Sequence, residues 1–147
     1  MPPTHSLRDL LRQGVTMQAL LEIDPKDMDS VYAHACQRYE QRDFIGAKKL
    51  LVMLTRLSHW QFDYWLALGL CCQHMGQHEE AVHSFSQSAQ LRLEDPRSAY
   101  LAGLSLHALG QADIARKAFS AALNWCGDKP EHQTLQQQAQ HMLTLCR

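Results

Sequence analysis

The sequence lacks an excess of charge of either sign. Its 147 residues carry 14 Lys and Arg against 15 Asp and Glu, which leaves a formal net charge of -1 at pH 7. Proteins that bind the phosphate backbone of nucleic acids need a concentrated basic excess, so we expect no nucleic-acid partner. The hydrophobic share of 46% is nevertheless ordinary for a chain with a core, and it argues against intrinsic disorder.

Long hydrophobic runs and a disulfide framework are also missing. The longest largely apolar stretch, residues 64–72, is about half the length that spans a bilayer, so we expect no direct membrane insertion. The first residues show no basic segment followed by an apolar one, and we expect no secretory signal. The 5 cysteines are odd in number and irregularly spaced. These features predict a cytoplasmic protein with reduced, mostly buried thiols.

Motifs for catalysis and metal binding are absent or incomplete. No Gly-rich phosphate loop or nucleophile elbow occurs. His78 and His83 flank a pair of glutamates, but at five residues apart they leave the common helix face that a zinc-protease motif requires. The densest group of metal-ligand residue types is Cys71, Cys72, His74 and His78, for which packing is the better explanation. We therefore expect no enzyme activity, no catalytic residue, no metal and no cofactor.

What the sequence does contain is a recurrence at an interval of 34 residues. Three columns repeat: Ala47, Ala81 and Ala115; Ala35, Gly69 and Gly103; Leu51, Phe85 and Phe119. The small residues suit positions where two helices approach closely, and the large ones fill the space beside them. This interval with these residue types is typical of tetratricopeptide repeats, which are helix-turn-helix units.

The register predicts an all-α fold with three tetratricopeptide repeats in a single domain, forming a short right-handed superhelix. Its parts are an N-terminal helical extension over 1–27, repeats over 28–61, 62–95 and 96–129, and a capping helix over 130–147. The middle repeat should have helices over 62–74 and 78–91, with Gly76 as the left-handed residue between them. Gly110 takes the same place in the third repeat.

Two details of the ends follow from local chemistry. In the first repeat Arg42 replaces the turn glycine, and a non-glycine residue in the left-handed conformation costs roughly 1 kcal/mol. In the extension, Thr16 is predicted to cap a short helix. The last segment carries one apolar stripe at helical spacing, formed by Leu135, Ala139, Met142 and Cys146.

A groove set of residues follows from the repeat register. In this repeat family the first helix of each repeat lines the concave surface, and its repeat positions 2, 5, 9 and 12 point into the groove. These positions are Asp29, Tyr32, Cys36, Tyr39, Asp63, Leu66, Leu70, Gln73, Arg97, Tyr100, Leu104 and His107. Three tyrosines, three leucines and few charges suit an extended peptide with hydrophobic anchors. The alternative, that these side chains only pack between neighbouring helices, stays open.

The chain resembles the class II chaperones of bacterial type III secretion, which guard hydrophobic translocator proteins. The resemblance rests on motifs in the family's order: Gly14-Val15-Thr16-Met17 with Leu20-Leu21, Phe62-Asp63-Tyr64-Trp65 with Leu68-Gly69, Asp95-Pro96-Arg97, and Glu131-His132. It implies a cytoplasmic, non-enzymatic chaperone. Its groove would bind an extended N-terminal segment of a translocator and keep that protein soluble and competent for secretion.

The resemblance also assigns residues. Tyr32, Tyr39, Leu66, Leu70, Tyr100 and Leu104 match groove positions of the family, whereas Cys36 stands where an aromatic residue is common. Family members are often homodimers through the N-terminal helices. Leu7, Leu10, Leu11, Met17 and Leu20 would serve that role here, or they would fold back on the first repeat.

Two other functions remain as alternatives. A general tetratricopeptide adaptor that clamps a C-terminal carboxylate needs Lys, Arg and Asn in its groove, and only Arg97 fits. A small metal-binding sensor or enzyme would use the Cys and His residues between Cys71 and His83.

Overall fold

The computed structural model describes residues 12 and 14–146, and the predicted residues Leu7, Leu10 and Leu11 lie outside this part. Helix α2 (Met17–Leu20) precedes three helix pairs: α3 (Pro25–Glu40) with α4 (Phe44–Leu57), α5 (Phe62–His74) with α6 (His78–Leu91), and α7 (Pro96–Ala108) with α8 (Ala112–Cys126). A 3-10 turn, η1 (Pro130–His132), leads into α9 (Gln133–Leu145). The described residues contain no strand, so the all-α prediction is confirmed, as are the predicted bounds of α5 and α6.

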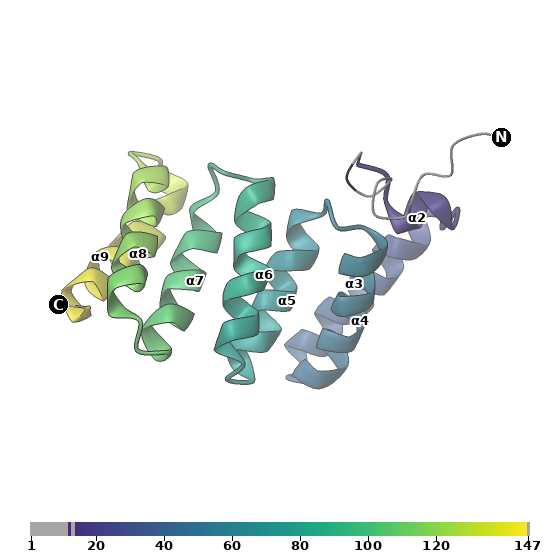
Figure 1. The fold of residues 1–147 in the computed structure, drawn as a ribbon, viewed down its shortest axis with the longest axis horizontal. Coiled ribbons are helices and arrows are strands. Elements are labelled where there is room, and N and C mark those ends of the chain that lie inside the picture. The colour runs from purple at the N-terminus through teal and green to yellow at the C-terminus, as the bar shows by residue number, and fades with distance from the viewer. Residues whose placement is uncertain (1–11, 13, 147) are drawn as a thin grey trace.

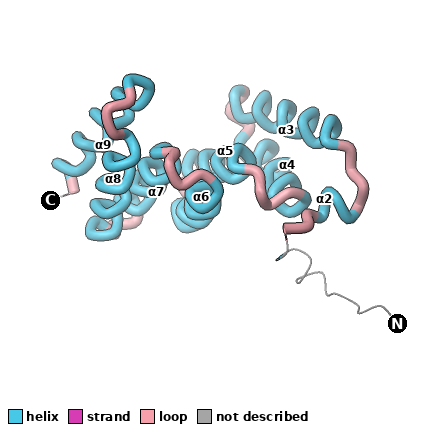
Figure 2. Tube along the Cα trace, turned by 90° about the horizontal axis from the view of Figure 1, so that it is seen from above, coloured by secondary structure: helices cyan, strands magenta, loops and turns pink. Residues whose placement is uncertain are grey.

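The helix pairs stack in chain order from α3 at one end to α9 at the other (Figure 1). Each second helix packs against the first helix of the next pair. Figures 1 and 2 show two layers, with α4, α6 and α8 on one side and α3, α5 and α7 on the other. In the described part, no helix is both long enough and apolar enough to cross a bilayer.

Close packing between the two helices of a pair explains the recurring small residues. A Cβ atom on Gly69 would lie 2.5 Å from Cε1 of Phe85, and one on Gly103 would lie 2.6 Å from Cε1 of Phe119. Both phenylalanine rings are fully buried. The ring of the second helix therefore occupies the space that a side chain on the first helix would need.

The turns follow the residues predicted for them. Gly76 and Gly110 have positive φ angles of 74° and 79°, and Arg42 adopts the same left-handed conformation with a φ of 64°. Thr16 caps α2 by accepting a hydrogen bond from the amide of Ala19, as predicted. The strained turn at Arg42 therefore occurs in the first repeat, at the position that glycine occupies in the other two.

The core consists of a larger cluster across α3 to α6 and a smaller one where α7, α8 and α9 meet. The larger cluster includes Leu51 and Phe85, and the smaller one includes Leu106, Phe119 and Cys146. The prediction of mostly buried thiols is confirmed, because all cysteines except Cys36 are buried. Cys36 is the one cysteine close to the surface, and it lies on α3.

Candidate functional site

A cavity of about 240 Å³ opens between α3 and α5 on the layer formed by the first helices. Its walls include Tyr32, Cys36 and Tyr39 from α3, with Ala67 and Leu70 from α5. Four of the predicted groove residues therefore share one cavity. Most of the exposed lining is apolar, so the cavity suits a hydrophobic side chain better than a charged one.

The tyrosines of this cavity are held in place and kept neutral. The ring of Tyr32 packs on Tyr64, with ring centroids 5.2 Å apart and planes tilted by 43°. Burial raises the pKa of Tyr32, and a hydrogen bond with Cys36 adds to that effect. Burial also raises the pKa of Tyr39. Both phenols therefore stay uncharged at physiological pH and offer an apolar ring with a polar tip.

Tyr39 is positioned by two residues that the repeat register did not identify, Phe44 and His74. The Tyr39 hydroxyl lies 2.9 Å from Nε2 of His74. The imidazole stacks on Phe44 with centroids 4.5 Å apart and planes within 2° of parallel. His74 follows Leu70 by four residues on α5, so extending the helical spacing by one turn would have found it. Phe44 begins α4, and no repeat position pointed to it.

Position 12 of each repeat joins neighbouring helices. Tyr39 contacts α5 through His74, as described above. The amide Nε2 of Gln73 on α5 donates to the Leu101 carbonyl at 3.0 Å and to Oγ of Ser105 at 2.9 Å, both on α7. His107 on α7 places Nδ1 3.4 Å from Sγ of Cys146, next to the end of α9. These predicted groove residues therefore hold consecutive first-layer helices together.

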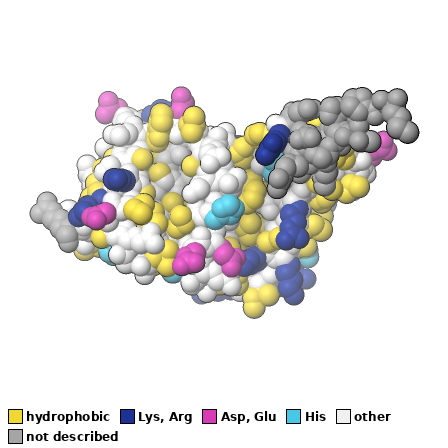
Figure 3. All heavy atoms as spheres, in the orientation of Figure 1, with side chains coloured by type: hydrophobic (Ala, Val, Ile, Leu, Met, Phe, Trp, Pro, Cys, Tyr) yellow, Lys and Arg dark blue, Asp and Glu magenta, His cyan; other side chains and the backbone are white. Residues whose placement is uncertain are grey.

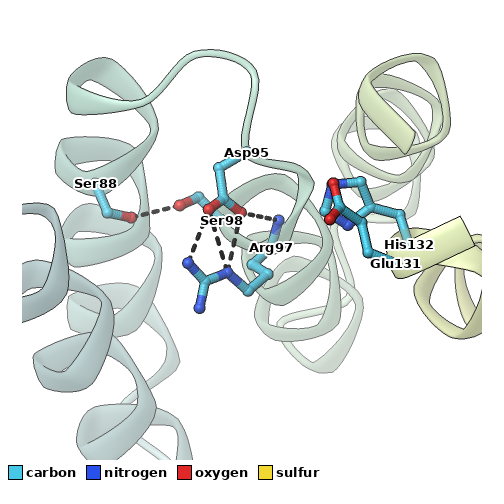
Figure 4. Close-up of polar contacts among 6 residues, drawn as sticks. All are labelled: Ser88, Asp95, Arg97, Ser98, Glu131 and His132. Atoms are coloured by element: carbon cyan, nitrogen blue, oxygen red, sulfur yellow. Dashed lines mark hydrogen bonds and ion pairs between the residues drawn. The ribbon is translucent and has the colours of Figure 1, made fainter. Parts of the chain in front are cut away.

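Arg97 is exposed, but it is likewise engaged by neighbouring side chains. Its guanidinium binds the Asp95 carboxylate (Figure 4), through Nε to Oδ1 at 3.0 Å and Nη2 to Oδ2 at 2.8 Å. It also stands 5.2 Å from the centre of the Phe62 ring. Burial opposes ionisation of Asp95, but hydrogen bonds from Arg97 outweigh it and lower the Asp95 pKa. The one basic residue of the groove set is thus already paired, which disfavours a carboxylate clamp.

The surroundings of that ion pair belong to the scaffold. Figure 4 shows the Ser88 and Ser98 hydroxyls pointing at each other, 2.7 Å apart, where they join α6 to α7 in the interior. Glu131 and His132 lie across from them on η1 and form a longer contact of 3.7 Å.

The remaining predicted groove residues differ in exposure. Asp63 is exposed and Leu66 is buried in the larger core cluster. Tyr100 tilts against Phe119 with ring centroids 5.9 Å apart, and Leu104 packs on the same smaller cluster. Tyr100 and Leu104 remain partly exposed, so they extend an apolar wall beyond the cavity towards α7.

The cysteine and histidine group of α5 and α6 serves packing and hydrogen bonding. Cys71 and Cys72 are buried, and burial raises the pKa of Cys71 to about 12. His74 faces Tyr39, while Nδ1 of His78 lies 3.1 Å from Oγ of Ser105. Throughout the part of the chain that is described, no group of three or more His, Cys, Asp or Glu residues could hold a metal ion.

Comparison with known proteins places these features in context. The tetratricopeptide repeat family model matches residues 62–95. The Low calcium response locus protein H of Yersinia pseudotuberculosis is 30% identical over 138 residues, which cover 94% of this chain and 82% of that protein.

Two solved structures extend the comparison. A type III secretion complex from Aeromonas hydrophila matches with a TM-score of 0.90 at 28% identity, covering 95% of this chain and 93% of that one. The Yersinia enterocolitica type III secretion chaperone SycD, in complex with a peptide of the translocator YopD, matches with a TM-score of 0.82 at 29% identity. That match covers 85% of this chain and 95% of SycD.

Proposed function

The chain belongs to the family of type III secretion translocator chaperones, and from this membership we propose that its concave face holds an extended segment of a hydrophobic translocator. The observation that carries the proposal is the largely apolar cavity between α3 and α5, walled by Tyr32, Tyr39 and Leu70, with Glu40 the one charged residue in its lining. The SycD structure with a translocator peptide supports it, because that chaperone shares this fold.

The binding energy has to come from several contacts together. Ordering a disordered client segment costs on the order of 2 to 5 kcal/mol. Burying one aliphatic or aromatic side chain contributes roughly 1.5 to 3 kcal/mol. One anchor in the cavity is therefore insufficient, and the partly exposed Tyr100 and Leu104 supply a second apolar contact along the groove. A client held in this way has its hydrophobic anchors covered, which prevents aggregation and premature membrane insertion.

Cys36 sets the shape of the first anchor site. It lies on the cavity wall between the two tyrosines of α3, at a position where an aromatic side chain is common in the family. A thiol is smaller than an aromatic ring, so the cavity has room for a bulky client side chain.

A double substitution tests the groove directly. Tyr32→Asp with Tyr39→Asp places two carboxylates in the apolar cavity, and desolvating them opposes binding. We expect a co-expressed N-terminal segment of the cognate translocator to be lost from the purified complex. Ile114→Asp on α8, an exposed site away from the cavity, is the matched control and should retain the client. Circular dichroism checks that both variants are folded, and normal client recovery by the folded double variant would refute the assignment.

We propose a second role for α2, which is pairing two copies of the chain. Leu20 and Leu21 are 41% and 57% exposed, and Met17 is half-buried. Two adjacent exposed leucines favour burial in an interface. Leu20→Ser with Leu21→Ser should lower the mass measured by sedimentation equilibrium towards that of a monomer, and an unchanged mass would contradict this role.

A further inference from the structure

Five exposed side chains follow one face of α4 and the turn after it: Ile45, Lys49, Met53, Arg56 and Trp60. The four members on α4 are three or four residues apart, which places them in line along the helix over roughly 16 Å, and Trp60 lies in the turn after the helix ends. Ile45, Met53 and Trp60 are 65%, 42% and 51% exposed. The helix itself, Phe44–Leu57, contains no acidic residue. We refer to these five residues as the α4 stripe.

The repeat register provides an internal comparison for the α4 stripe. The equivalent positions are Glu79, His83, Gln87, Gln90 and Glu94 in the second repeat, and Asp113, Lys117, Ala121, Asn124 and Asp128 in the third. Figure 3 shows the contrast on this face, with Lys and Arg among hydrophobic side chains over α4 and carboxylates over α6. The other two repeats thus carry no large hydrophobic residue at these positions, so packing does not require the hydrophobic ones of the α4 stripe.

The charge and position of the α4 stripe indicate which kind of partner would bind it. A second copy packed stripe against stripe would bring Lys49 and Arg56 against like charges. A cavity of about 350 Å³ lies beside α4, but Glu79 and Glu80 border it and disfavour an acidic peptide there. The α4 stripe lies on the layer formed by the second helices, and a surface with hydrophobic and basic side chains in alternation fits a flat, anionic partner.

We propose that the α4 stripe docks this protein on an anionic bilayer surface. Ile45, Met53 and Trp60 enter the boundary between headgroups and acyl chains, while Lys49 and Arg56 pair with lipid phosphates. The contact is peripheral and needs no helix that spans the bilayer. The cavity with Tyr32 and Tyr39 lies on the opposite layer, so client and lipid surface can be held at the same time. This role goes beyond client binding and does not depend on it.

Vesicle flotation of the full chain tests the proposal with two matched triple variants. The target variant carries Ile45→Ser, Lys49→Gln and Trp60→Ser. The control variant carries Ile114→Ser, Lys117→Gln and Trp125→Ser, which removes the same residue types from α8, where Ile114 and Trp125 are 52% and 43% exposed. The vesicles contain either phosphatidylcholine alone or about 30% phosphatidylglycerol in phosphatidylcholine.

We expect the wild-type chain and the control variant to float with the anionic vesicles, and to lose that association at high salt or on neutral vesicles. The bound fraction of the target variant should fall by roughly tenfold, with client recovery unchanged. Failure of the wild-type chain to bind anionic vesicles would overturn the proposal, as would equal binding by the target variant or equal loss in the control. A monomer-dimer shift caused by the target substitutions without vesicle binding would identify a second copy as the occupant instead.

Discussion

The two ends of the concave face use the same repeat positions differently. At the α3 end, Tyr32, Cys36 and Tyr39 wall an open cavity. Their equivalents two repeats later are Tyr100, Leu104 and His107, which contact Phe119, the smaller core cluster and Cys146. The register therefore determines which direction a side chain faces. Whether that side chain is available to a ligand depends on what the neighbouring helix places against it.

The difference follows from what lies next to each first-layer helix. Helix α7 packs against α8 and also meets α9, so Tyr100, Leu104 and His107 each have a contact within the protein, although Tyr100 and Leu104 stay partly exposed. Helix α3 is preceded in the described part by α2 alone, and the space between α3 and α5 is left partly open. We call the α3 end, with its open cavity, the receptive end of the concave face, and the α7 end, where α8 and α9 pack, the consolidated end. Gln73 on α5 is hydrogen-bonded to α7 between them.

The largest loss of stability should come from a substitution in the core beneath one end of the concave face only. Phe119→Ala removes a fully buried ring from the consolidated end, which should lower the free energy of unfolding by about 3 to 5 kcal/mol. Because repeat arrays are stabilised by neighbouring contacts, hydrogen exchange should accelerate mainly in α7 to α9. Client affinity, measured well below the unfolding temperature, should fall less than in a variant of the α3 end, because Tyr100, which packs on Phe119, supplies only one of the apolar contacts along the groove.

Phe85→Ala provides the comparison for that experiment. Phe85 belongs to the larger cluster beneath the receptive end, so its loss should reduce both stability and client affinity. Equal loss of client affinity in the two variants would show that the ends are not separable.

An intermediate loss of stability is expected where α5 is hydrogen-bonded to α7. Gln73→Ala removes two hydrogen bonds to α7, each with a net contribution of about 1 kcal/mol, so the free energy of unfolding should fall by about 2 kcal/mol. Tyr39→Phe removes one bond, to His74, and should cost about half as much. Urea unfolding followed by circular dichroism measures both. A larger loss of unfolding free energy for Tyr39→Phe than for Gln73→Ala would contradict this prediction, because it would show that the contact of α3 with α5 matters more than that of α5 with α7.

The smallest loss of stability is expected for substitutions of the aspartates that cap α3 and α7. Asp95 accepts the Arg97 amide hydrogen bond at the start of α7, and Asp24 accepts that of Lys26 at the start of α3. Either Asp→Ala substitution should cost about 1 kcal/mol at pH 7. Because Arg97 lowers the pKa of folded Asp95, ionised Asp95 stabilises the fold at neutral pH, and that contribution disappears as the pH falls below about 4.

The measurement for this prediction is urea unfolding from pH 7 down to pH 3. The difference between wild type and Asp95→Ala should shrink as the pH falls through the Asp95 titration. Asp24 has Lys26 in the equivalent place, and among the described residues the two side chains form no ion pair, so Asp24→Ala controls for the loss of a cap alone. A difference for Asp95→Ala that stays constant with pH would show that its ion pair with Arg97 does not contribute.

Much of the fold could be predicted because its signals are local. The bounds of α5 and α6, the left-handed turns at Gly76 and Arg42, and the cap at Thr16 depend on neighbouring residues or on one helical period. The partners of Tyr39 could not be predicted in the same way. Phe44 and His74 meet on that side chain from two other helices, and their stacking depends on how three helices are placed together.

The sequence by itself determined the repeat length, the helices and the family, and it predicted a list of positions that face the groove. These properties arise from residue types at fixed separations along one chain, which backbone geometry converts directly into helix faces. Only the tertiary structure decided which of those positions line a cavity and which connect helices. Availability depends on the volume and hydrogen-bonding partners that the next helix supplies, and those are set by packing between elements distant in sequence.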